Sequence, residues 1–248
     1  MAQLLHIAIA GASGGIGAAM LEIVSQRDDV GLIHATYHQS PAGSALGSIG
    51  NFAGATEVRW SAMDASDESS VAAWVESLGA VDWLINCVGM LHTQHRGPEK
   101  SIRQIEADHF TDSMRINCLP SLLLGKYARP VLKGSAKGVF AVLSARVGSI
   151  SDNQLGGWYS YRASKAALNM SLKCLAIEWE RNTRNVRVVA LHPGTTDSRL
   201  SKPFQKNVPD GKLFPAEKTA RMLIEQIENL HEHPSGRFIA YDAEEIPW

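Results

Sequence analysis

The sequence has few cysteines, and they follow no recognisable pattern. Cys87, Cys118 and Cys174 are the only three among 248 residues, and no two of them form a C-x-x-C pair. An odd number without such spacing is typical of reduced thiols, so we expect a cytoplasmic protein without a disulfide framework.

Long apolar runs and an excess of either charge are also lacking. No run approaches the roughly 18 apolar residues that span a membrane, and no cation precedes the short N-terminal run, so neither a membrane helix nor a signal peptide is predicted. Lysine and arginine number 24 against 25 acidic residues, which gives a net charge of −1. The chain therefore lacks the basic excess of a nucleic-acid-binding protein.

Motifs of hydrolases and of metalloproteins are missing as well. The sequence contains no G-x-S-x-G nucleophile motif. Its nine histidines include the close pairs His92/His95 and His231/His233, but no cysteine or carboxylate cluster joins either pair at ligand spacing. We expect no metal site, and a small molecule as the partner.

Short apolar runs alternate with longer amphipathic stretches along the whole chain. The runs mostly lack polar alternation, as buried parallel strands do. Strands are predicted at Leu4–Ala10, Leu32–Tyr37, Glu57–Trp60, Val81–Asn86, Val139–Ser144, Val186–Leu191 and Phe238–Tyr241. Helices are predicted after Gly17, at Ser69–Leu78, at Phe110–Leu124, from Tyr161 onward and at Ala216–Leu230. No linker interrupts the pattern, so residues 1–248 are predicted to form one α/β domain, a doubly wound parallel sheet of about seven strands with helices on both faces.

Three irregular stretches, 92–101, 144–159 and 195–213, begin just after predicted strand ends. In open α/β sheets the ligand binds beyond the carboxyl ends of the strands. These stretches are therefore the expected substrate loops.

A glycine-rich turn connects the first strand to the first helix. Gly11 permits a sharp turn, Gly15 lets the backbone approach a pyrophosphate, and Gly17 lets helix and strand pack closely. The spacing is G-x3-G-x-G rather than G-x-G-x-x-G, and a glycine cluster alone is often an ordinary turn. Its position between strand and helix favours a dinucleotide site.

Tyr161 and Lys165 are four residues apart in a predicted helix, so they lie on one face of it. A nearby ammonium favours the phenolate and would lower the tyrosine pKa, which suits general acid–base chemistry. Tyr159 lies off that face. The alternative is an ordinary surface pair, because this spacing often occurs by chance.

Together the glycine turn, the Tyr161/Lys165 pair and their separation resemble the short-chain dehydrogenase/reductase family over essentially the whole chain. Asn86-Cys87-Val88-Gly89, Asn117, Pro193-Gly194 and Asp64 resemble further family motifs. The run from Tyr161 to Asn169 and the C-terminal residues are similar to the C-factor/sniffer-like carbonyl reductase branch.

The resemblance implies a Rossmann-type fold and hydride transfer between NAD(P)H and a carbonyl or alcohol substrate. Tyr161 would be the proton donor, Lys165 would hold the nicotinamide ribose, and Asn117 would anchor a water relay. It also implies a homodimer or homotetramer built through Phe110–Leu124 and Tyr161–Arg181. The cofactor-binding residues that it implies are Gly11, Ser13, Gly14, Gly15, Ile16, Gly17, Tyr37, His38, Asp64, Asn86, Gly89, Tyr161, Lys165, Pro193, Gly194 and Thr196.

The serine that polarises the substrate in this family has no clear counterpart. Alignment on Gly148 puts Ala145 at its position. Ser144 is one residue earlier and would point to the other face of a regular strand. Ser149, in the following loop, is the rival candidate. We favour Ser144.

The cofactor expected here is NADP(H) rather than NAD(H). An NAD site usually has an acidic residue about 20 residues beyond the glycines, on the ribose 2′-hydroxyl. Tyr37 stands there, and no Asp or Glu occurs from Val30 to Thr56. No Lys or Arg occurs there either, so His38, Gln39 and Ser40 are the candidate donors to a 2′-phosphate.

Two classes of function follow. The first is an NADP-dependent carbonyl reductase or alcohol dehydrogenase, which the presence of Tyr161, Lys165 and Asn117 favours. The second is a nicotinamide-binding regulatory or signalling protein with little turnover, which Ala145 favours.

Overall fold

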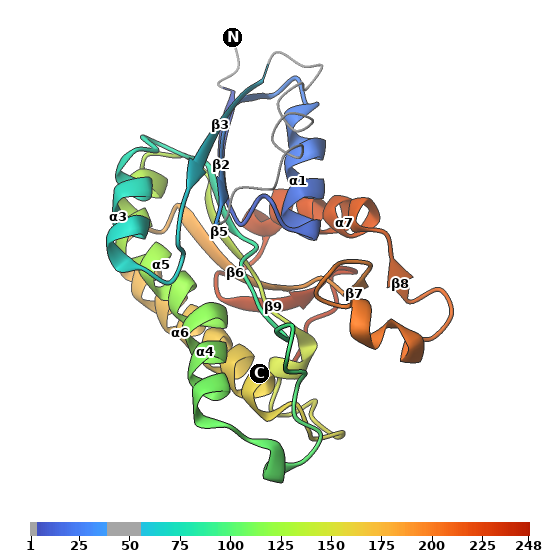
Figure 1. The fold of residues 1–248 in the computed structure, drawn as a ribbon. Coiled ribbons are helices and arrows are strands. Elements are labelled where there is room, and N and C mark those ends of the chain that lie inside the picture. The colour runs from blue at the N-terminus through green and yellow to red at the C-terminus, as the bar shows by residue number, and fades with distance from the viewer. Residues whose placement is uncertain (1–3, 39–55) are drawn as a thin grey trace.

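The computed structural model describes residues 4–38 and 56–248. Seven parallel strands form one central sheet between two layers of helices (Figure 1). This arrangement confirms the predicted Rossmann-type α/β fold. The strands of the sheet are β1 (Leu5–Ala10), β2 (Val30–Tyr37), β3 (Glu57–Ala62), β4 (Trp83–Asn86), β5 (Gly138–Leu143), β6 (Val186–His192) and β9 (Arg237–Ala240).

The strand order is β3-β2-β1-β4-β5-β6-β9, and every neighbouring pair is parallel. The chain moves outward from β1 to β3 and then returns to the other side of β1 with β4. The order reverses between β1 and β4, so the connections after these two strands leave toward opposite faces of the sheet. Open α/β sheets bind ligands in the crevice at such a point.

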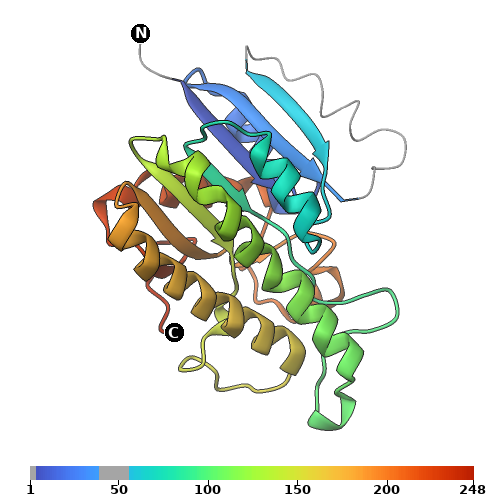
Figure 2. The ribbon, with the colours of Figure 1, turned by 90° about the vertical axis from the view of Figure 1, so that its left-hand side faces the viewer.

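In the part of the chain that the structure describes, two helices cover one face of the sheet and four cover the other. Figure 1 shows α1 (Gly15–Ser25) and α7 (Ala216–Glu228) side by side on the first face. Figure 2 shows the second face. Its helices are α3 (Glu68–Glu76), α4 (Ala107–Asn117), α5 (Leu119–Lys133) and α6 (Tyr159–Asn182).

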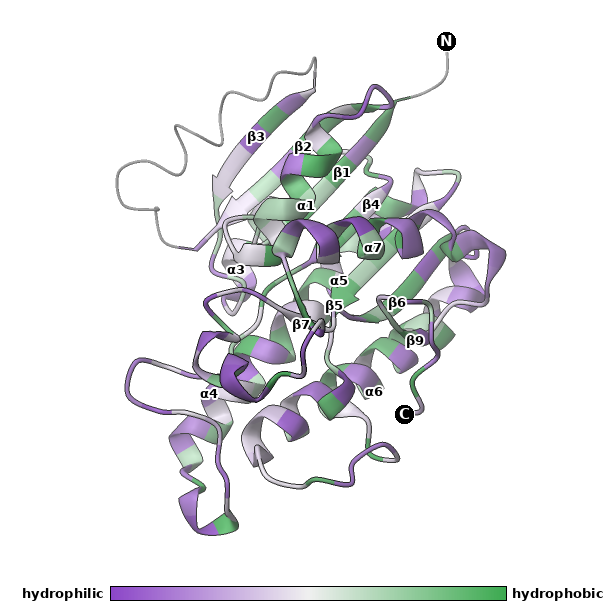
Figure 3. Ribbon diagram, turned by 90° about the vertical axis from the view of Figure 1, so that its right-hand side faces the viewer, coloured by the Kyte–Doolittle hydropathy of each residue, from purple (hydrophilic) through white to green (hydrophobic). Residues whose placement is uncertain are grey.

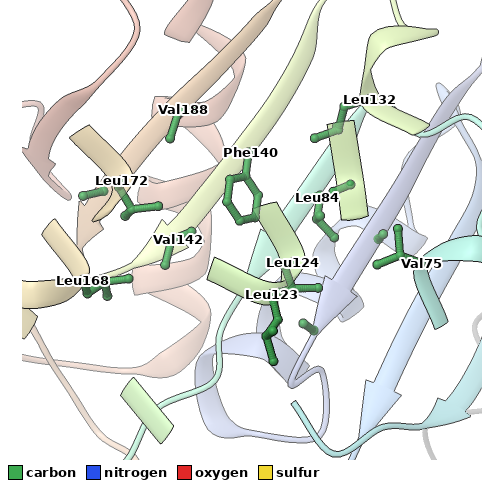
Figure 4. Packing of buried hydrophobic residues seen from close by; sticks show 14 of the residues in the cluster. Val75, Leu84, Leu123, Leu124, Leu132, Phe140, Val142, Leu168, Leu172 and Val188 are labelled. Atoms are coloured by element: carbon green, nitrogen blue, oxygen red, sulfur yellow. The ribbon is translucent and has the colours of Figure 1, made fainter. Parts of the chain in front are cut away.

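Apolar strands between two helical layers produce two separate cores. All six residues of β5 are buried, and Figure 3 shows that the central strands are largely apolar. Figure 4 shows the core under the second face, where Phe140 of β5 lies among leucine and valine side chains from α3, α5 and α6. Burial on both faces explains why these strands lack polar alternation.

The predicted single helix Phe110–Leu124 is wrong, because the structure has two helices there. α4 ends at Asn117, and α5 begins at Leu119 and continues to Lys133. Pro120 lies in the first turn of α5, where its missing N–H is tolerated, but inside a continuous helix it would remove a backbone hydrogen bond. Cys118 is the junction between the two helices.

Two short strands, β7 (Thr195–Thr196) and β8 (Leu213–Phe214), pair with each other across the segment that contains the 3-10 helix η3 (Lys202–Asn207). The sequence did not predict them. Among the described residues, no helix combines the length and the apolar character that a bilayer crossing requires.

Candidate active site

A cavity of about 330 Å³ lies at the carboxyl ends of the central strands. The glycine turn, the ends of β4, β5 and β6, and the first turn of α6 all contribute to it. Two of the expected substrate loops line it, 144–159 and 195–213. Loop 92–101 contributes no lining residue, although Leu91, just before it, does.

The glycine turn forms one end of this cavity. α1 begins at Gly15 after Gly14, which has no side chain to cap the helix, so the first-turn N–H groups face the cavity without a protein side-chain partner. A Cβ on Gly17 would lie 2.4 Å from the carbonyl oxygen of Gly11, and Gly11 itself has a φ of 75°. The turn therefore requires glycine at both positions, and it presents free donors to an anion.

Tyr161 and Lys165 lie on successive turns of α6 and both line the cavity. The Lys165 Nζ donates a 3.0 Å hydrogen bond to the carbonyl of Leu143 and lies 5.9 Å from the centre of the Tyr161 ring. The side chains are 9% and 3% exposed. The predicted helix and shared face are therefore present.

Burial sets the ionisation of this pair. It lowers the pKa of Lys165 to about 8 and raises the pKa of Tyr161. The sequence analysis predicted a lowered pKa for Tyr161, which is the opposite direction. Because Lys165 Nζ bonds to the Leu143 carbonyl, loss of solvent dominates at the phenol, and Tyr161 remains a neutral acid.

Asn117 links the loop after β4 to the catalytic helix. Its Oδ1 accepts from the backbone N–H of Met90 at 2.7 Å, and its Nδ2 donates to the Met90 carbonyl and to Ser164 Oγ. A Cβ added to Gly89 would lie 3.4 Å from Asn117 Oδ1 and 3.6 Å from Lys165 Nζ. Asn117 is thus near the lysine, as the resemblance implied.

Ser144, Ala145 and Ser149 are the three positions considered for the substrate-polarising serine, and they differ in whether they line the cavity. Ser144 lines the cavity, and its hydroxyl donates to Oδ1 of Asn169 at 2.6 Å. Ala145 also lines it. Ser149 does not, and its hydroxyl donates to the carbonyl of Pro247 at 2.5 Å.

The predicted cofactor residues fall into two groups. Those that line the cavity are Gly14, Gly15, Ile16, Gly17, Gly89, Tyr161, Lys165, Pro193, Gly194 and Thr196. Those that do not are Gly11, Ser13, Tyr37, His38, Asp64 and Asn86.

The second group lies at the carboxyl ends of β1 to β4 or in the turns just after them. His38 Nε2 is 3.7 Å from Asp64 Oδ2, and both side chains are largely exposed. Hydrogen bonds from Ser66 lower the pKa of Asp64. Gln39 and Ser40 lie outside the described residues.

Sequence reasoning missed a buried carboxylate beside the catalytic helix. Glu99 is 3% exposed, and its side chain accepts hydrogen bonds from the backbone N–H and the hydroxyl of Ser160, the residue before Tyr161. Its carbonyl also accepts from the backbone N–H of Trp158 at 2.5 Å. Loop 92–101 therefore holds the start of α6, a role that no local pattern signals because the partners are about 60 residues apart.

Comparisons with known proteins agree with this arrangement. The chain is 31% identical over 170 residues to C-signal from Myxococcus xanthus, which covers 68% of this chain and 94% of that protein. It is 29% identical over 213 residues to a benzil reductase ((S)-benzoin forming) from Saccharomyces cerevisiae, covering 82% of this chain and 75% of the relative. It is also 35% identical over 147 residues to 1-hydroxy-2-glutathionyl-2-methyl-3-butene dehydrogenase from Rhodococcus, covering 59% of this chain and 62% of that protein.

Among solved structures, the carbonyl reductase Sniffer of D. melanogaster superposes with a TM-score of 0.84 at 19% identity, covering 99% of this chain and all of that one. An NADPH-bound carbonyl reductase from chicken fatty liver superposes with a TM-score of 0.83 at 22% identity over the full length of both chains. The family model for short chain dehydrogenase matches residues 5–209. The chain belongs to the short-chain dehydrogenase/reductase family of oxidoreductases.

Proposed function

We propose that this protein is an NADP(H)-dependent reductase that interconverts a carbonyl compound and the corresponding alcohol, with Tyr161 as the proton donor. The observation that carries the proposal is the cavity itself, which has an anion-binding glycine turn at one end and a buried tyrosine–lysine pair beside it.

The residues of the cavity fit a dinucleotide. The first-turn N–H groups of α1 would hold the pyrophosphate, and Gly194 and Thr196 would border the nicotinamide. When bound, NADPH supplies the hydride. The protein supplies the position of the substrate and the proton.

Tyr161 is suited to donate that proton because burial keeps its phenol neutral. The oxygen of the substrate becomes an alkoxide as the carbonyl is reduced, and an alkoxide is a stronger base than a phenolate. Lys165 places a positive charge next to the phenolate that remains, and Asn117 fixes the loop after β4, whose Gly89 lies close to the Lys165 ammonium.

Ser144 is the proposed donor to the substrate oxygen, and Asn169 controls it. While the hydroxyl hydrogen of Ser144 points to Asn169 Oδ1, Ser144 has no hydrogen to donate to the substrate oxygen. Among the described residues, the buried Nδ2 of Asn169 has no hydrogen-bond partner. A half-turn of the Asn169 amide lets this nitrogen donate to Ser144 Oγ, which satisfies a buried donor and frees the hydroxyl hydrogen for the substrate.

NADP(H) is the proposed cofactor because the end of β2 has no acidic residue to repel a 2′-phosphate. Tyr37 and His38 occupy that end. Of His38, Gln39 and Ser40, only His38 lies within the described residues, and its imidazole is the proposed donor to the 2′-phosphate.

The alternative is a nicotinamide-binding signalling protein with little turnover. The similarity to C-signal and the alanine at position 145 favour it. The buried Tyr161/Lys165 pair favours catalysis, because a protein that only binds the cofactor has no use for a buried proton donor.

A screen of carbonyl compounds with NADPH, followed by Tyr161→Phe, tests the proposal. We expect Tyr161→Phe to lose several orders of magnitude in kcat while its affinity for NADPH is nearly unchanged. Tyr159→Phe is the matched control, because Tyr159 is exposed two residues away, and it should keep normal activity. Normal turnover by Tyr161→Phe would refute the assignment. NADPH binding without turnover of any carbonyl by the unmodified protein would favour the signalling role.

The protein is further proposed to work in the cytoplasm as a homodimer or homotetramer, as members of its family usually do. The exposed apolar side chains Leu122 on α5 and Met170 and Ile177 on α6 would lie in the interface.

A further inference from the structure

Aromatic rings from three separate segments meet at the substrate side of the cavity. Trp158, just before α6, and Phe204, in η3, have ring centres 5.2 Å apart, and both line the cavity. Trp158 is 6.3 Å from the ring of Tyr161 in an edge-on arrangement, and His92 packs edge-on against Phe204 at 5.9 Å. We call Trp158 and Phe204 the aromatic wall.

The backbone places Trp158 in a conformation that few side chains adopt. Its φ is 52° and its ψ is 43°, in the left-handed region, and it follows Gly156 and Gly157, whose φ angles are also positive. Such a conformation is unfavourable for a residue with a Cβ unless the surroundings fix it. The backbone N–H and C=O of Trp158 are both bonded, to the Glu99 carbonyl and the Arg162 N–H. The fold thus maintains a strained backbone that directs an indole to the cavity.

Phe204, the second residue of the aromatic wall, is held by contacts of the segment between β7 and β8. Phe204 belongs to the segment between β7 and β8, and His92 connects that segment to the loop after β4 because its Nε2 lies 3.3 Å from the carbonyl of Arg199. The two rings therefore have fixed supports on both sides. The wall is part of the folded protein before any substrate binds.

The cavity beside the wall has apolar and basic lining residues but no acidic one among the described residues. Leu91, Val147 and Leu200 complete this side of the cavity. No aspartate or glutamate is among the lining residues in the part of the chain that the structure describes. Two arginines line the cavity: Arg146, which pairs with Asp152 and Glu244, and Arg199, which lies in the same segment as Phe204. A cationic substrate would find no counter-charge here, whereas a flat apolar group would find ring faces and edges.

We infer that the natural substrate is an aryl carbonyl compound, whose ring packs against the aromatic wall while its carbonyl oxygen faces Tyr161. This inference rests on the proposed reductase function and adds the substrate class. Aromatic rings prefer offset or edge-on packing at 4.5–7 Å, so the two wall residues and Tyr161 provide three such contacts to a planar ring and fewer to a puckered one.

Acetophenone and cyclohexyl methyl ketone test the inference, because they have the same carbon skeleton and differ in the planarity of the ring. We expect kcat/KM with NADPH to be about tenfold higher for acetophenone. Phe204→Leu and Trp158→Asn should reduce this ratio to about two or less while both ketones are still reduced. Asparagine is chosen at position 158 because it tolerates the left-handed backbone. Phe214→Leu is the control, since Phe214 packs on Tyr241 outside the cavity, and it should retain the ratio.

A ratio near one in the unmodified protein, or an unchanged ratio in both wall variants, would overturn the inference and leave the reductase function intact. Binding to the NADP⁺ complex gives a readout that does not need turnover. There, 1-phenylethanol should bind about tenfold more tightly than 1-cyclohexylethanol, and the wall variants should remove the difference. If the unmodified protein reduces neither these ketones nor any other carbonyl compound in the screen but keeps this binding preference, the reductase proposal fails and the aromatic specificity stands. Equal binding of the two alcohols contradicts the inference whatever the turnover.

Discussion

The hydroxyl of Ser144 and the amide of Asn169 form a buried pair 2.6 Å apart, where the end of β5 meets α6. The orientation of one amide thereby decides whether the serine hydrogen points into the protein or toward the substrate. Of Ser144 and Ser149, only Ser144 lines the cavity. Whether its hydroxyl hydrogen can be donated to a substrate depends on Asn169.

Three variants test this dependence. Ser144→Ala should lower kcat by about 10²–10³, which is the usual effect of losing one donor to a developing oxyanion. Asn169→Asp should lower kcat similarly, because an ionised carboxylate only accepts hydrogen bonds and holds the serine hydrogen. Ser149→Ala, whose hydroxyl bonds to Pro247 outside the cavity, should leave kcat almost unchanged. If Ser144→Ala is almost fully active while Tyr161→Phe is inactive, the reaction proceeds without a serine donor and Ala145 is a true departure from the family pattern.

The preference for NADPH should respond to one substitution. Tyr37→Asp places a carboxylate at the end of β2, where it repels a 2′-phosphate and accepts from a 2′-hydroxyl. We expect the unmodified protein to bind NADPH more tightly than NADH and the variant to reverse that order, as measured by fluorescence titration of both. Tyr37→Phe serves as the control, and it should retain the original preference. Equal affinities in the unmodified protein would contradict the argument.

Stability should depend on pH through Lys165. Its pKa is lowered to about 8 in the folded protein, below the usual value of about 10.4, because burial disfavours the charged form. The unfolded chain therefore binds more protons than the folded one between these values. The free energy of unfolding should rise from pH 8 to about pH 10.4, by up to about 3 kcal/mol relative to Lys165→Met. Urea unfolding of both proteins across this range measures the difference, and parallel pH profiles would refute the lowered pKa.

Assembly should depend on the exposed apolar residues of α6. Met170 is 66% exposed and Ile177 is 46% exposed, and the two are seven residues apart, on one face of the helix. A charge at either position would be buried in the interface, so Ile177→Asp should dissociate the oligomer in sedimentation velocity at micromolar concentration. Ile102→Asp, on a side chain that is 62% exposed and lies outside α5 and α6, should not. A monomeric unmodified protein would contradict the expected assembly.

The sequence predicted those features that depend on local spacing. Strand and helix positions follow from short-range periodicity, and Tyr161 and Lys165 share a face because four residues make about one helical turn. The division at Cys118 was missed because apolar residues continue on both sides of it, with Met114 and Ile116 before it and Leu119 after it, and only Pro120 marks the start of the second helix.

Features that depend on distant partners could not be predicted. Phe204 and Trp158 meet from segments 46 residues apart, and neither segment has a periodic pattern. The direction of the Tyr161 pKa follows from the burial of its phenol in the folded protein, and Lys165 beside it bonds to the Leu143 carbonyl of β5. The search for an acidic cofactor residue between positions 30 and 56 could not reveal that Asp64, from the end of β3, would lie beside His38.

The anchoring of the loop 92–101 has a consequence for directed evolution. Its end is fixed to the catalytic helix through Glu99, whereas Gly97 has open space around its α-carbon. Residues 93–97 can therefore be randomised, or the loop lengthened there, without loosening the start of α6. A library confined to these positions would vary the segment that follows the cavity residue Leu91 and would spare the contacts of Glu99 with the start of α6.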